Sequence, residues 1–241
     1  MRVTVCELRS GALAEDWPRL VEHVRAQEPD LVLLPEMGLS PWFARERSFD
    51  AAAWDAAVAA HASWPLDELG AAVVLGTSPV VRDGRRLNEA WVDGRAAHHK
   101  RFLPDEEDFW EASWYAPGDG TFAAVPAGAA RVGFLVCTEL WFLEHARAYG
   151  RDGAHLLAVP RCTPVESLDK WLAGGRTAAV CAGAYALSSN HGDERFGGRG
   201  WVVDPEGEVL AVTSRESPFA TVEVDLAFAE ASKATYPRYV R

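Results

Sequence analysis

The sequence predicts an α/β fold, because short buried strands alternate with helices along the chain. Residues 31–34 and 71–76 are apolar runs bounded by turn-forming residues, which is typical of strands covered on both faces. A segment with helical features precedes each run. Residues 16–28 carry apolar side chains at helical spacing, and residues 50–63 are rich in alanine after Asp50, a favourable N-cap. Two helix–strand units in succession indicate parallel strands joined by helices.

The remaining elements follow from the same patterns. Residues 1–8 alternate apolar and polar side chains, as a half-buried strand does. Asp83-Gly84 and Asp93-Gly94 favour two tight turns, so residues 79–100 should form antiparallel strands and not another helical crossover. After them we expect a long irregular loop, a buried strand, a helix and a further strand, over residues 100–120, 132–136, 166–181 and 183–190.

The composition limits the possible partners and the compartment. With 49% apolar and 24% charged residues, the chain suits one large globular domain over residues 1–241. The net charge of −11 argues against nucleic acid or an anionic membrane as a partner, because both attract basic surfaces. No apolar run is long enough to span a bilayer, and residues 1–8 lack the apolar core of a secretion signal. The cysteines form no C-x-x-C pair, so we expect a reducing, cytoplasmic setting.

Cys137 is the first candidate for chemistry. It directly follows the buried strand at 132–136, and apolar residues at helical spacing begin at Leu140, so a helix should start at this corner. The carboxyl end of a strand is where open α/β sheets usually bind ligands. The unpaired N–H groups of a following helix would favour a thiolate and could bind an oxyanion. Cys137 is therefore a candidate nucleophile, although a cysteine in an apolar strand can also serve packing alone.

Two acidic residues are further candidates. Glu36 follows the first buried apolar run, where a carboxylate is costly unless it is paired or faces a cleft; an ordinary loop position is the alternative. Glu111 lies among the aromatic residues of the 100–120 loop, and loops of this length are often functional. His98 and His99 are adjacent in a strand and point to opposite faces, which argues against a shared metal. We therefore expect neither a metal nor another cofactor.

Four short motifs occur in order along the chain, and together they resemble the nitrilase superfamily of carbon–nitrogen hydrolases. They are Leu33-Leu34-Pro35-Glu36, Lys100-Arg101-Phe102-Leu103-Pro104, Phe109-Trp110-Glu111 ahead of Pro117-Gly118-Asp119, and Gly133-Phe134-Leu135-Val136-Cys137-Thr138-Glu139. Residues 145–160 and 197–210 also resemble the family's later elements, so the resemblance covers nearly the whole chain.

The resemblance implies a four-layer α-β-β-α sandwich, in which two sheets pack face to face between helical layers. It also implies that protomers pair through their helices, as a homodimer or a higher homo-oligomer. The matching positions imply a Glu-Lys-Cys triad of Glu36, Lys100 and Cys137, supported by Glu111 as a second carboxylate. The basic, aromatic tail at 231–241 either docks onto a neighbour or is a frayed end.

The chemistry that the resemblance implies is hydrolysis of a small-molecule amide through a thioester. Cys137 would attack the carbonyl carbon, and Glu36 would act as general base. Lys100 and the backbone N–H of Thr138 would bind the oxyanion that forms. The expected substrate is a small linear amide or an N-carbamoyl compound.

Specificity should come from residues around the nucleophile, including Glu139 and Trp141 as substrate contacts. Superfamily members that cleave nitriles tend to be longer and to carry Trp where this chain has Thr138, which favours an amide over a nitrile. Three alternatives stay open: nitrile hydrolysis, acyl transfer by the same thioester, and a catalytically silent binding protein of this fold.

Overall fold

In the part of the chain that the structure describes, twelve strands form two halves that meet where the end of β1 (Arg2–Leu8) lies beside the end of β9 (Tyr185–His191). The computed structural model describes residues 1–70 and 72–240. In spatial order, the first half contains β5 (Arg95–His99), β4 (Arg85–Val92), β3 (Val73–Arg82), β2 (Leu31–Leu33), β1 and β12 (Phe219–Glu223). The second half contains β6 (Val125–Ala127), β7 (Ala130–Phe134), β8 (Leu156–Arg161), β9, β10 (Trp201–Val203) and β11 (Val209–Val212).

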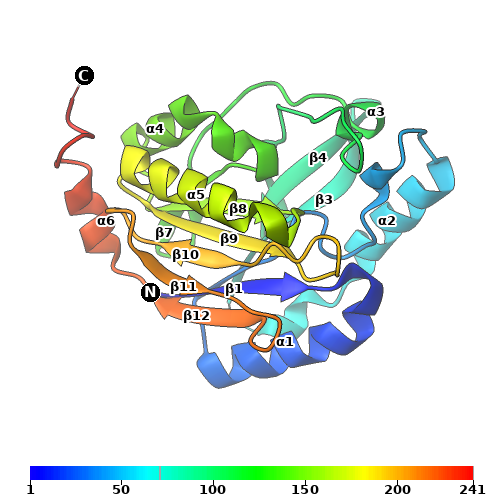
Figure 1. Ribbon diagram of the computed structural model, residues 1–241, viewed down its shortest axis with the longest axis horizontal. Helices are drawn as coiled ribbons and strands as arrows, with labels where there is room; N and C mark the ends of the chain where they lie inside the picture. Colours follow the sequence, from blue (N-terminus) through cyan, green and yellow to red (C-terminus); the bar gives the residue numbers. More distant parts are fainter. Residues whose placement is uncertain (71, 241) are drawn as a thin grey trace.

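Helices cover the outer faces of the two halves. In Figure 1, α4 and α5 lie above β8 and β9, whereas α1 lies below β1 on the opposite side of the molecule. The α-helices are α1 (Leu13–Gln27), α2 (Ala51–Ser63), α3 (Glu111–Trp114), α4 (Leu143–Arg151), α5 (Leu168–Ala182) and α6 (Leu226–Ser232). Short 3₁₀ turns occur at Ser10–Ala12, Phe43–Arg45, Leu66–Leu69, Cys137–Trp141 and Val165–Ser167.

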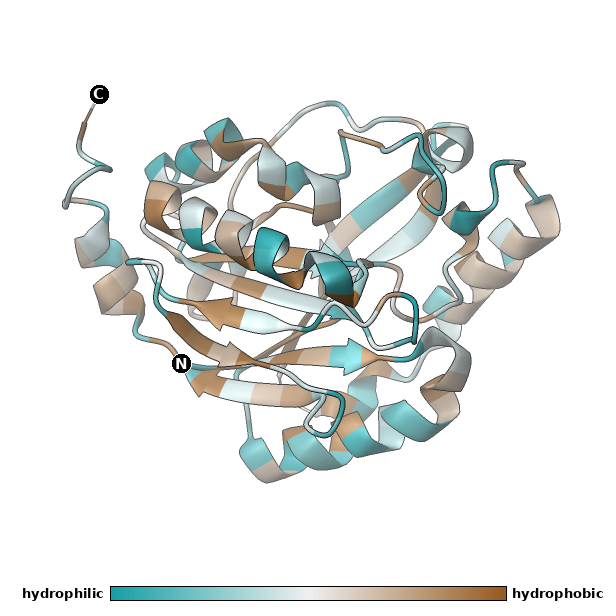
Figure 2. Cartoon of the chain, in the orientation of Figure 1, coloured by the Kyte–Doolittle hydropathy of each residue, from teal (hydrophilic) through white to brown (hydrophobic). Residues whose placement is uncertain are grey.

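Alternate side chains of each strand point into different layers, and this alternation sets the architecture. Apolar side chains from both halves meet in one central cluster, which includes Val3, Leu31, Leu33, Phe134, Leu156 and Ala158. Their neighbours along the strands pack outward: Val32 and Leu34 contact the side chains of α1, and Leu157 and Val159 contact those of α4 and α5. The structure is therefore the expected four-layer α-β-β-α sandwich. Figure 2 shows mainly hydrophobic central strands between helices whose outward-facing residues are largely hydrophilic.

The predicted strands and turns of the first half are confirmed. The apolar run at 31–34 contains β2, and residues 79–100 contribute to the antiparallel strands β3, β4 and β5. The strand expected over 71–76 begins at Val73, and Ala71 lies outside the described residues. In these strands the chain reverses twice, so β3 and β5 run in the same direction.

The start of the first helix differs from the prediction. Helix α1 begins at Leu13, not at Asp16. Asp16 lies in the first turn of the helix, where its carboxylate accepts the backbone N–H and the guanidinium of Arg9. The second helix follows the prediction: the Asp50 carboxylate accepts the N–H of Ala52 at 2.8 Å, as an N-cap should.

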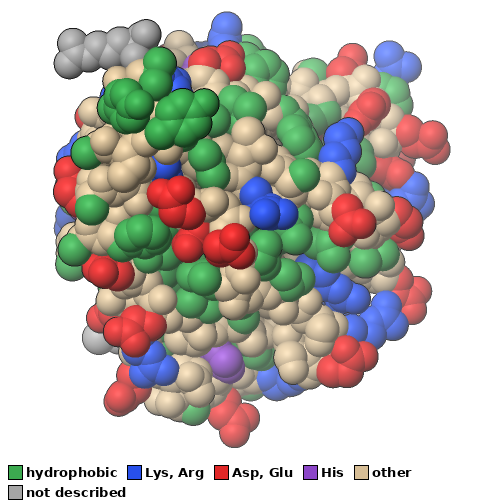
Figure 3. All heavy atoms as spheres, turned by 60° about the vertical axis from the view of Figure 1, so that its left-hand side comes forward, with side chains coloured by type: hydrophobic (Ala, Val, Ile, Leu, Met, Phe, Trp, Pro, Cys, Tyr) green, Lys and Arg blue, Asp and Glu red, His purple; other side chains and the backbone are tan. Residues whose placement is uncertain are grey.

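The surface carries intermixed charges and an anchored tail. On the face shown in Figure 3, acidic and basic side chains are interspersed with apolar ones. Tyr236 and Tyr239 are exposed near the C-terminal end, but Arg238 forms an ion pair with Glu206 at 2.9 Å, so this part of the tail is held against the β10–β11 turn. None of the helices in the described part of the chain is both long and apolar enough to cross a membrane.

Candidate active site

Three of the predicted site residues follow strands that point the same way. Strands β1, β2 and β3 are parallel, and β5 shares their direction after two antiparallel pairings. Strands β7, β8 and β9 are parallel to one another and to β1. The carboxyl ends of β2, β5 and β7 therefore point to the same edge. Glu36, Lys100 and Cys137 come shortly after these ends, which is where the sheet order brings their side chains together.

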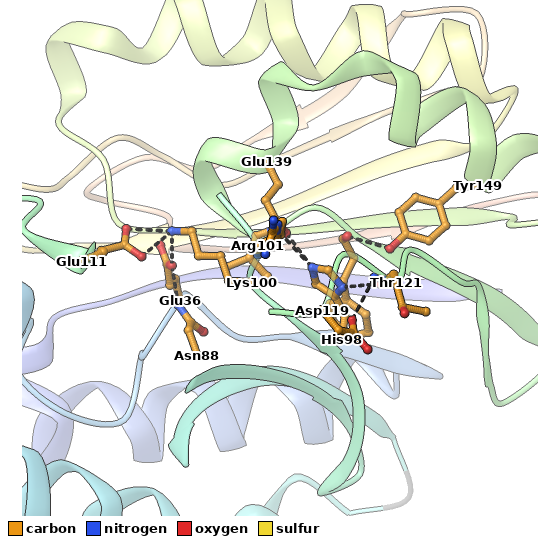
Figure 4. Close-up of polar contacts among 12 residues, drawn as sticks. Glu36, Asn88, His98, Lys100, Arg101, Glu111, Asp119, Thr121, Glu139 and Tyr149 are labelled. Atoms are coloured by element: carbon orange, nitrogen blue, oxygen red, sulfur yellow. Dashed lines mark hydrogen bonds and ion pairs between the residues drawn. The ribbon is translucent and has the colours of Figure 1, made fainter. Parts of the chain in front are cut away.

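Lys100 binds both candidate carboxylates. Its Nζ donates to Glu36 Oε1 at 2.8 Å and to Glu111 Oε1 and Oε2 at 2.7 Å each (Figure 4). All three side chains are fully buried. Asn88 on β4 donates its Nδ2 to the same Glu36 oxygen at 2.8 Å. Figure 4 shows Glu36 and Glu111 approaching the ammonium from different directions, so one cation serves two carboxylates.

Burial and mutual charge set the protonation of this cluster. Burial disfavours the Lys100 ammonium, but the Glu111 and Glu36 carboxylates outweigh burial and raise the Lys100 pKa. Burial raises the pKa of Glu111 to about 8, against the opposing charge of Lys100, and the Glu36 charge adds to the increase. Lys100 is therefore a permanent cation at neutral pH, whereas Glu111 binds a proton far more readily than a free carboxylate does.

Cys137 lies beside this cluster, on a turn that differs from the prediction. It begins a 3₁₀ turn, Cys137–Trp141, and α4 starts only at Leu143. Its φ of 49° is in the left-handed region, which is unfavourable for a residue with a Cβ and is typical of a functional position.

The expectation that a helix end would favour the thiolate is wrong. Burial raises the pKa of the Cys137 thiol to about 12, and the Glu36 charge raises it further, while Lys100 opposes both. The resting side chain is therefore a thiol, and a base must remove its proton during reaction. Cys137 retains only 4% exposure.

The other predicted residues lie in different surroundings. Thr138 is half-buried in the 3₁₀ turn. Glu139 is fully buried, and its carboxylate binds His98 and backbone N–H groups, so none of its hydrogen bonds is directed to an open site. Trp141 is 38% exposed and packs its ring against Trp171 at a centroid distance of 4.9 Å.

Sequence patterns missed two residues that hold Glu36. Asn88 lies within a strand that had no functional feature in the sequence. His191 ends β9 and donates Nε2 to the backbone carbonyl of Glu36 at 2.6 Å. Its position at the carboxyl end of a buried strand could have identified it by the rule that identified Cys137.

Within residues 1–70 and 72–240, no group of three or more His, Cys, Asp or Glu side chains is arranged to hold a metal ion. The adjacent histidines bind separate partners, as their opposite directions predict: His98 binds Glu139, and His99 binds Glu89.

Comparison with known proteins agrees with this geometry. A family model described as Carbon-nitrogen hydrolase matches residues 2–234. The chain belongs to the carbon–nitrogen hydrolase family. Within this family, the fold superposes on a carbon–nitrogen hydrolase from Helicobacter pylori with a TM-score of 0.82 and 22% identity, covering 99% of this chain and 94% of that one. It also superposes on the Caenorhabditis elegans NitFhit protein with a TM-score of 0.82 and 20% identity, covering 98% of this chain and 63% of that one. These likenesses show that the chain shares the fold of both proteins.

Relatives found by sequence comparison share limited identity with this chain. A glutamine-dependent NAD(+) synthetase from Rhodobacter capsulatus is 30% identical over an alignment of 241 positions that covers 93% of this chain and 43% of that protein. A chloroplastic omega-amidase from Arabidopsis thaliana is 27% identical over an alignment of 243 positions that covers 91% of this chain and 65% of that protein. The chain thus spans less than two thirds of the length of either relative.

Proposed function

We propose that the protein is an amidohydrolase that cleaves the C–N bond of a small linear amide or N-carbamoyl compound through a thioester on Cys137. The observation that carries this proposal is the Lys100 ammonium, buried between Glu36 and Glu111 beside the thiol. An amide is a poor electrophile, so its hydrolysis needs a nucleophile, a base and a charge that stabilises the oxyanion. This cluster contains a side chain suited to each role.

In the first half-reaction, Glu36 takes the proton from the Cys137 thiol as sulfur attacks the carbonyl carbon. The C=O electron pair moves to oxygen, and the Lys100 ammonium and the Thr138 N–H stabilise the resulting oxyanion. The intermediate then collapses to a thioester as the C–N bond breaks. Glu36 gives its proton to the leaving nitrogen, which departs as ammonia or an amine.

In the second half-reaction, Glu36 takes a proton from water, whose oxygen attacks the thioester carbon. Collapse of the second oxyanion releases the acid and returns the proton to sulfur. Glu111 binds Lys100 through both of its oxygens, so its role is to hold the ammonium in place. Two further hydrogen bonds hold Glu36, the proposed base, in place. Asn88 donates its Nδ2 to the Glu36 carboxylate, and His191 donates its Nε2 to the Glu36 backbone carbonyl.

Two observations support a small substrate. The thiol retains 4% exposure, and two buried aromatic residues lie on or against elements of the site, since Trp114 shares α3 with Glu111 and the Trp42 ring packs edge-on against His191. The omega-amidase relative, and N-carbamoylputrescine amidases at 26% identity over about half of this chain, support amide and carbamoyl groups as the bond that is cleaved. The synthetase relatives, named as glutamine-dependent, add glutamine to the candidates.

Ammonia release from a panel of primary amides, N-carbamoyl amines, glutamine and nitriles tests the proposal. Turnover of an amide should disappear in Cys137→Ala. It should persist in Cys181→Ala, the control variant, which also removes a free cysteine, one that is not fully buried. Turnover that survives Cys137→Ala would refute the proposal. Turnover of nitriles alone, or product formed only with an added amine acceptor, would favour nitrile hydrolysis or acyl transfer instead.

We also propose that the protein acts as a homodimer or a higher homo-oligomer. The exposed side chains of Tyr236, Tyr239 and Phe228 near the C-terminal end support this, because exposed aromatic residues in proximity often mark an interface. Light scattering after size-exclusion chromatography measures the mass directly, and a monomer at micromolar concentration would contradict the proposal.

A further inference from the structure

His98 and Glu139 form a buried ion pair next to the Lys100 cluster. His98 Nε2 lies 3.0 and 2.9 Å from the two Glu139 oxygens, and His98 Nδ1 lies 3.0 Å from the carbonyl oxygen of Thr121 (Figure 4). His98 is 5% exposed and Glu139 is fully buried. Burying two charges is costly, so a pair at this depth calls for an explanation.

The contacts define the protonation state of the pair. A carbonyl oxygen and a carboxylate accept hydrogen bonds, so both ring nitrogens of His98 must donate. The ring is therefore an imidazolium. Burial opposes this charge, but the hydrogen bond and the charge of Glu139 outweigh burial and raise the His98 pKa.

The Glu139 carboxylate also joins two distant segments of backbone. Its Oε1 accepts the N–H of Arg101 at 2.6 Å, directly after Lys100, and its Oε2 accepts the N–H of Val136 at 2.9 Å, directly before Cys137. One side chain thus holds the backbone beside the ammonium and beside the nucleophile. The second of these contacts also supports the left-handed conformation of Cys137, which a residue with a Cβ does not adopt readily.

We infer that the His98–Glu139 pair is a positioning device that fixes Cys137 relative to Lys100 without touching the substrate. The inference rests on the proposed function for the roles of those two residues. Its physical basis is the demand of nucleophilic catalysis for fixed geometry, where a displacement of about 1 Å can cost about a hundredfold in rate.

The groups around His98 give it no other charged partner at hydrogen-bonding distance among the described residues. Asp119 acts on His98 through its charge alone, and the Phe122 ring packs on the imidazole at a centroid distance of 4.7 Å. On the far side of Phe122 lies His145, stacked on it, and Tyr149 donates to a backbone carbonyl. Among the described residues, Glu139 is therefore the charged group that hydrogen-bonds to His98, and the charge of Asp119 adds to its effect.

The strand contains a matched control. His99, the next residue, binds Glu89 at 2.9 Å on the opposite face of β5, away from the nucleophile turn. His99→Asn removes a histidine–glutamate contact from the same strand but leaves the backbone bonds of Glu139 intact.

The test compares kcat, KM and iodoacetamide labelling of Cys137 in the folded wild-type protein, His98→Asn, His98→Gln and Glu139→Gln. Asn retains a donor near Thr121 but cannot reach Glu139, whereas Gln places an N–H near the position of Nε2. We expect His98→Asn and Glu139→Gln to lower kcat about a hundredfold and to leave KM within about threefold. We expect His98→Gln to recover part of the loss and His99→Asn to match the wild-type protein. The kcat of the double variant His98→Asn/Glu139→Gln should be no lower than that of the less active single variant, because both changes disrupt the same His98–Glu139 pair.

Several outcomes would overturn the inference. The first is that His98→Asn and Glu139→Gln lower kcat no more than His99→Asn does. The second is that these two variants change KM alone. The third is that the fold-loss of kcat in the double variant equals the product of the fold-losses in the two single variants. If the variants do not fold, ¹⁵N-histidine NMR of the wild-type protein tests the ion pair instead. A His98 ring with only one of its two nitrogens protonated at about pH 7 would contradict the ion pair. If no amide is cleaved at all, the proposed function fails separately, and the labelling rate of Cys137 still tests whether the pair positions the thiol.

Discussion

Replacing Lys100 with Met leaves the Glu36 and Glu111 carboxylates buried without the ammonium that binds both. Three charge-assisted hydrogen bonds of 2.7 to 2.8 Å disappear, and no solvent replaces them because all three side chains are fully buried. Removing one partner from a buried ion pair typically costs about 3–5 kcal/mol of unfolding free energy. Activity should fall by at least the roughly hundredfold to thousandfold that one oxyanion donor supplies, because Lys100 is the proposed donor and also binds the proposed base, Glu36.

The double variant Lys100→Met/Glu111→Gln separates these two effects. It removes one of the two buried carboxyl groups that lose the ammonium, so part of the stability should return. Activity should not return, since the proposed oxyanion donor, Lys100, is still absent. Urea unfolding at neutral pH with an unchanged m-value measures the first effect, and ammonia release measures the second. A Lys100→Met protein as stable as the wild type, or a double variant no more stable than the single one, would refute the reasoning.

Further predictions concern the thiol, the packing of α5 and the response to acid. Because the pKa of Cys137 is raised to about 12, iodoacetamide labelling, corrected with Cys137→Ala, should rise about tenfold per pH unit from neutral pH upward; a plateau near pH 8 would contradict this. Gly175→Ala should lower the melting temperature despite a gain of about 1 kcal/mol in helix propensity, because its Cβ would lie 2.3 Å from the buried Trp201 ring. In Gly174→Ala, the new Cβ would lie 2.8 Å from the partly exposed Trp141 ring, so the melting temperature should fall by less. An equal fall in both variants would contradict the explanation by packing. Burial disfavours the Asp193 carboxylate, but the nearby His191 ring and hydrogen bonds from Ser10 lower its pKa to about 2. Asp193 therefore stabilises the fold above its unfolded pKa, and this stabilisation is lost as the pH falls through about 2. The stability difference between wild type and Asp193→Asn should therefore shrink towards pH 2, and a constant difference would be inconsistent with this linkage.

Strand order made part of the site predictable. Glu36 and Cys137 each follow a buried apolar run, and two turns at Asp83-Gly84 and Asp93-Gly94 return the chain so that β5 ends at the same edge. Local patterns suffice for such features because they depend on which residues end a strand. The pairing of Lys100 with both carboxylates came from the family resemblance, since spacing along the chain does not show which side chains meet.

What could not be predicted depends on burial and on backbone conformation. The sequence suggested a thiolate at a helix end, whereas Cys137 begins a 3₁₀ turn in the left-handed region and burial keeps it protonated. Glu139 was expected at the substrate, but its carboxylate is saturated by His98 and two backbone N–H groups. Both differences arise because the environment of a side chain is formed by segments far apart in the sequence.

Trapping the acyl-enzyme by mass spectrometry tests the central claim most directly. The protein would be mixed with an amide that it turns over, quenched in acid within the first turnover, and digested. The account predicts that the peptide containing Cys137 gains the mass of the acyl group, that hydroxylamine removes this mass, and that Cys137→Ala shows none. Continued turnover with no adduct on this peptide, or an adduct on another residue, would contradict the account.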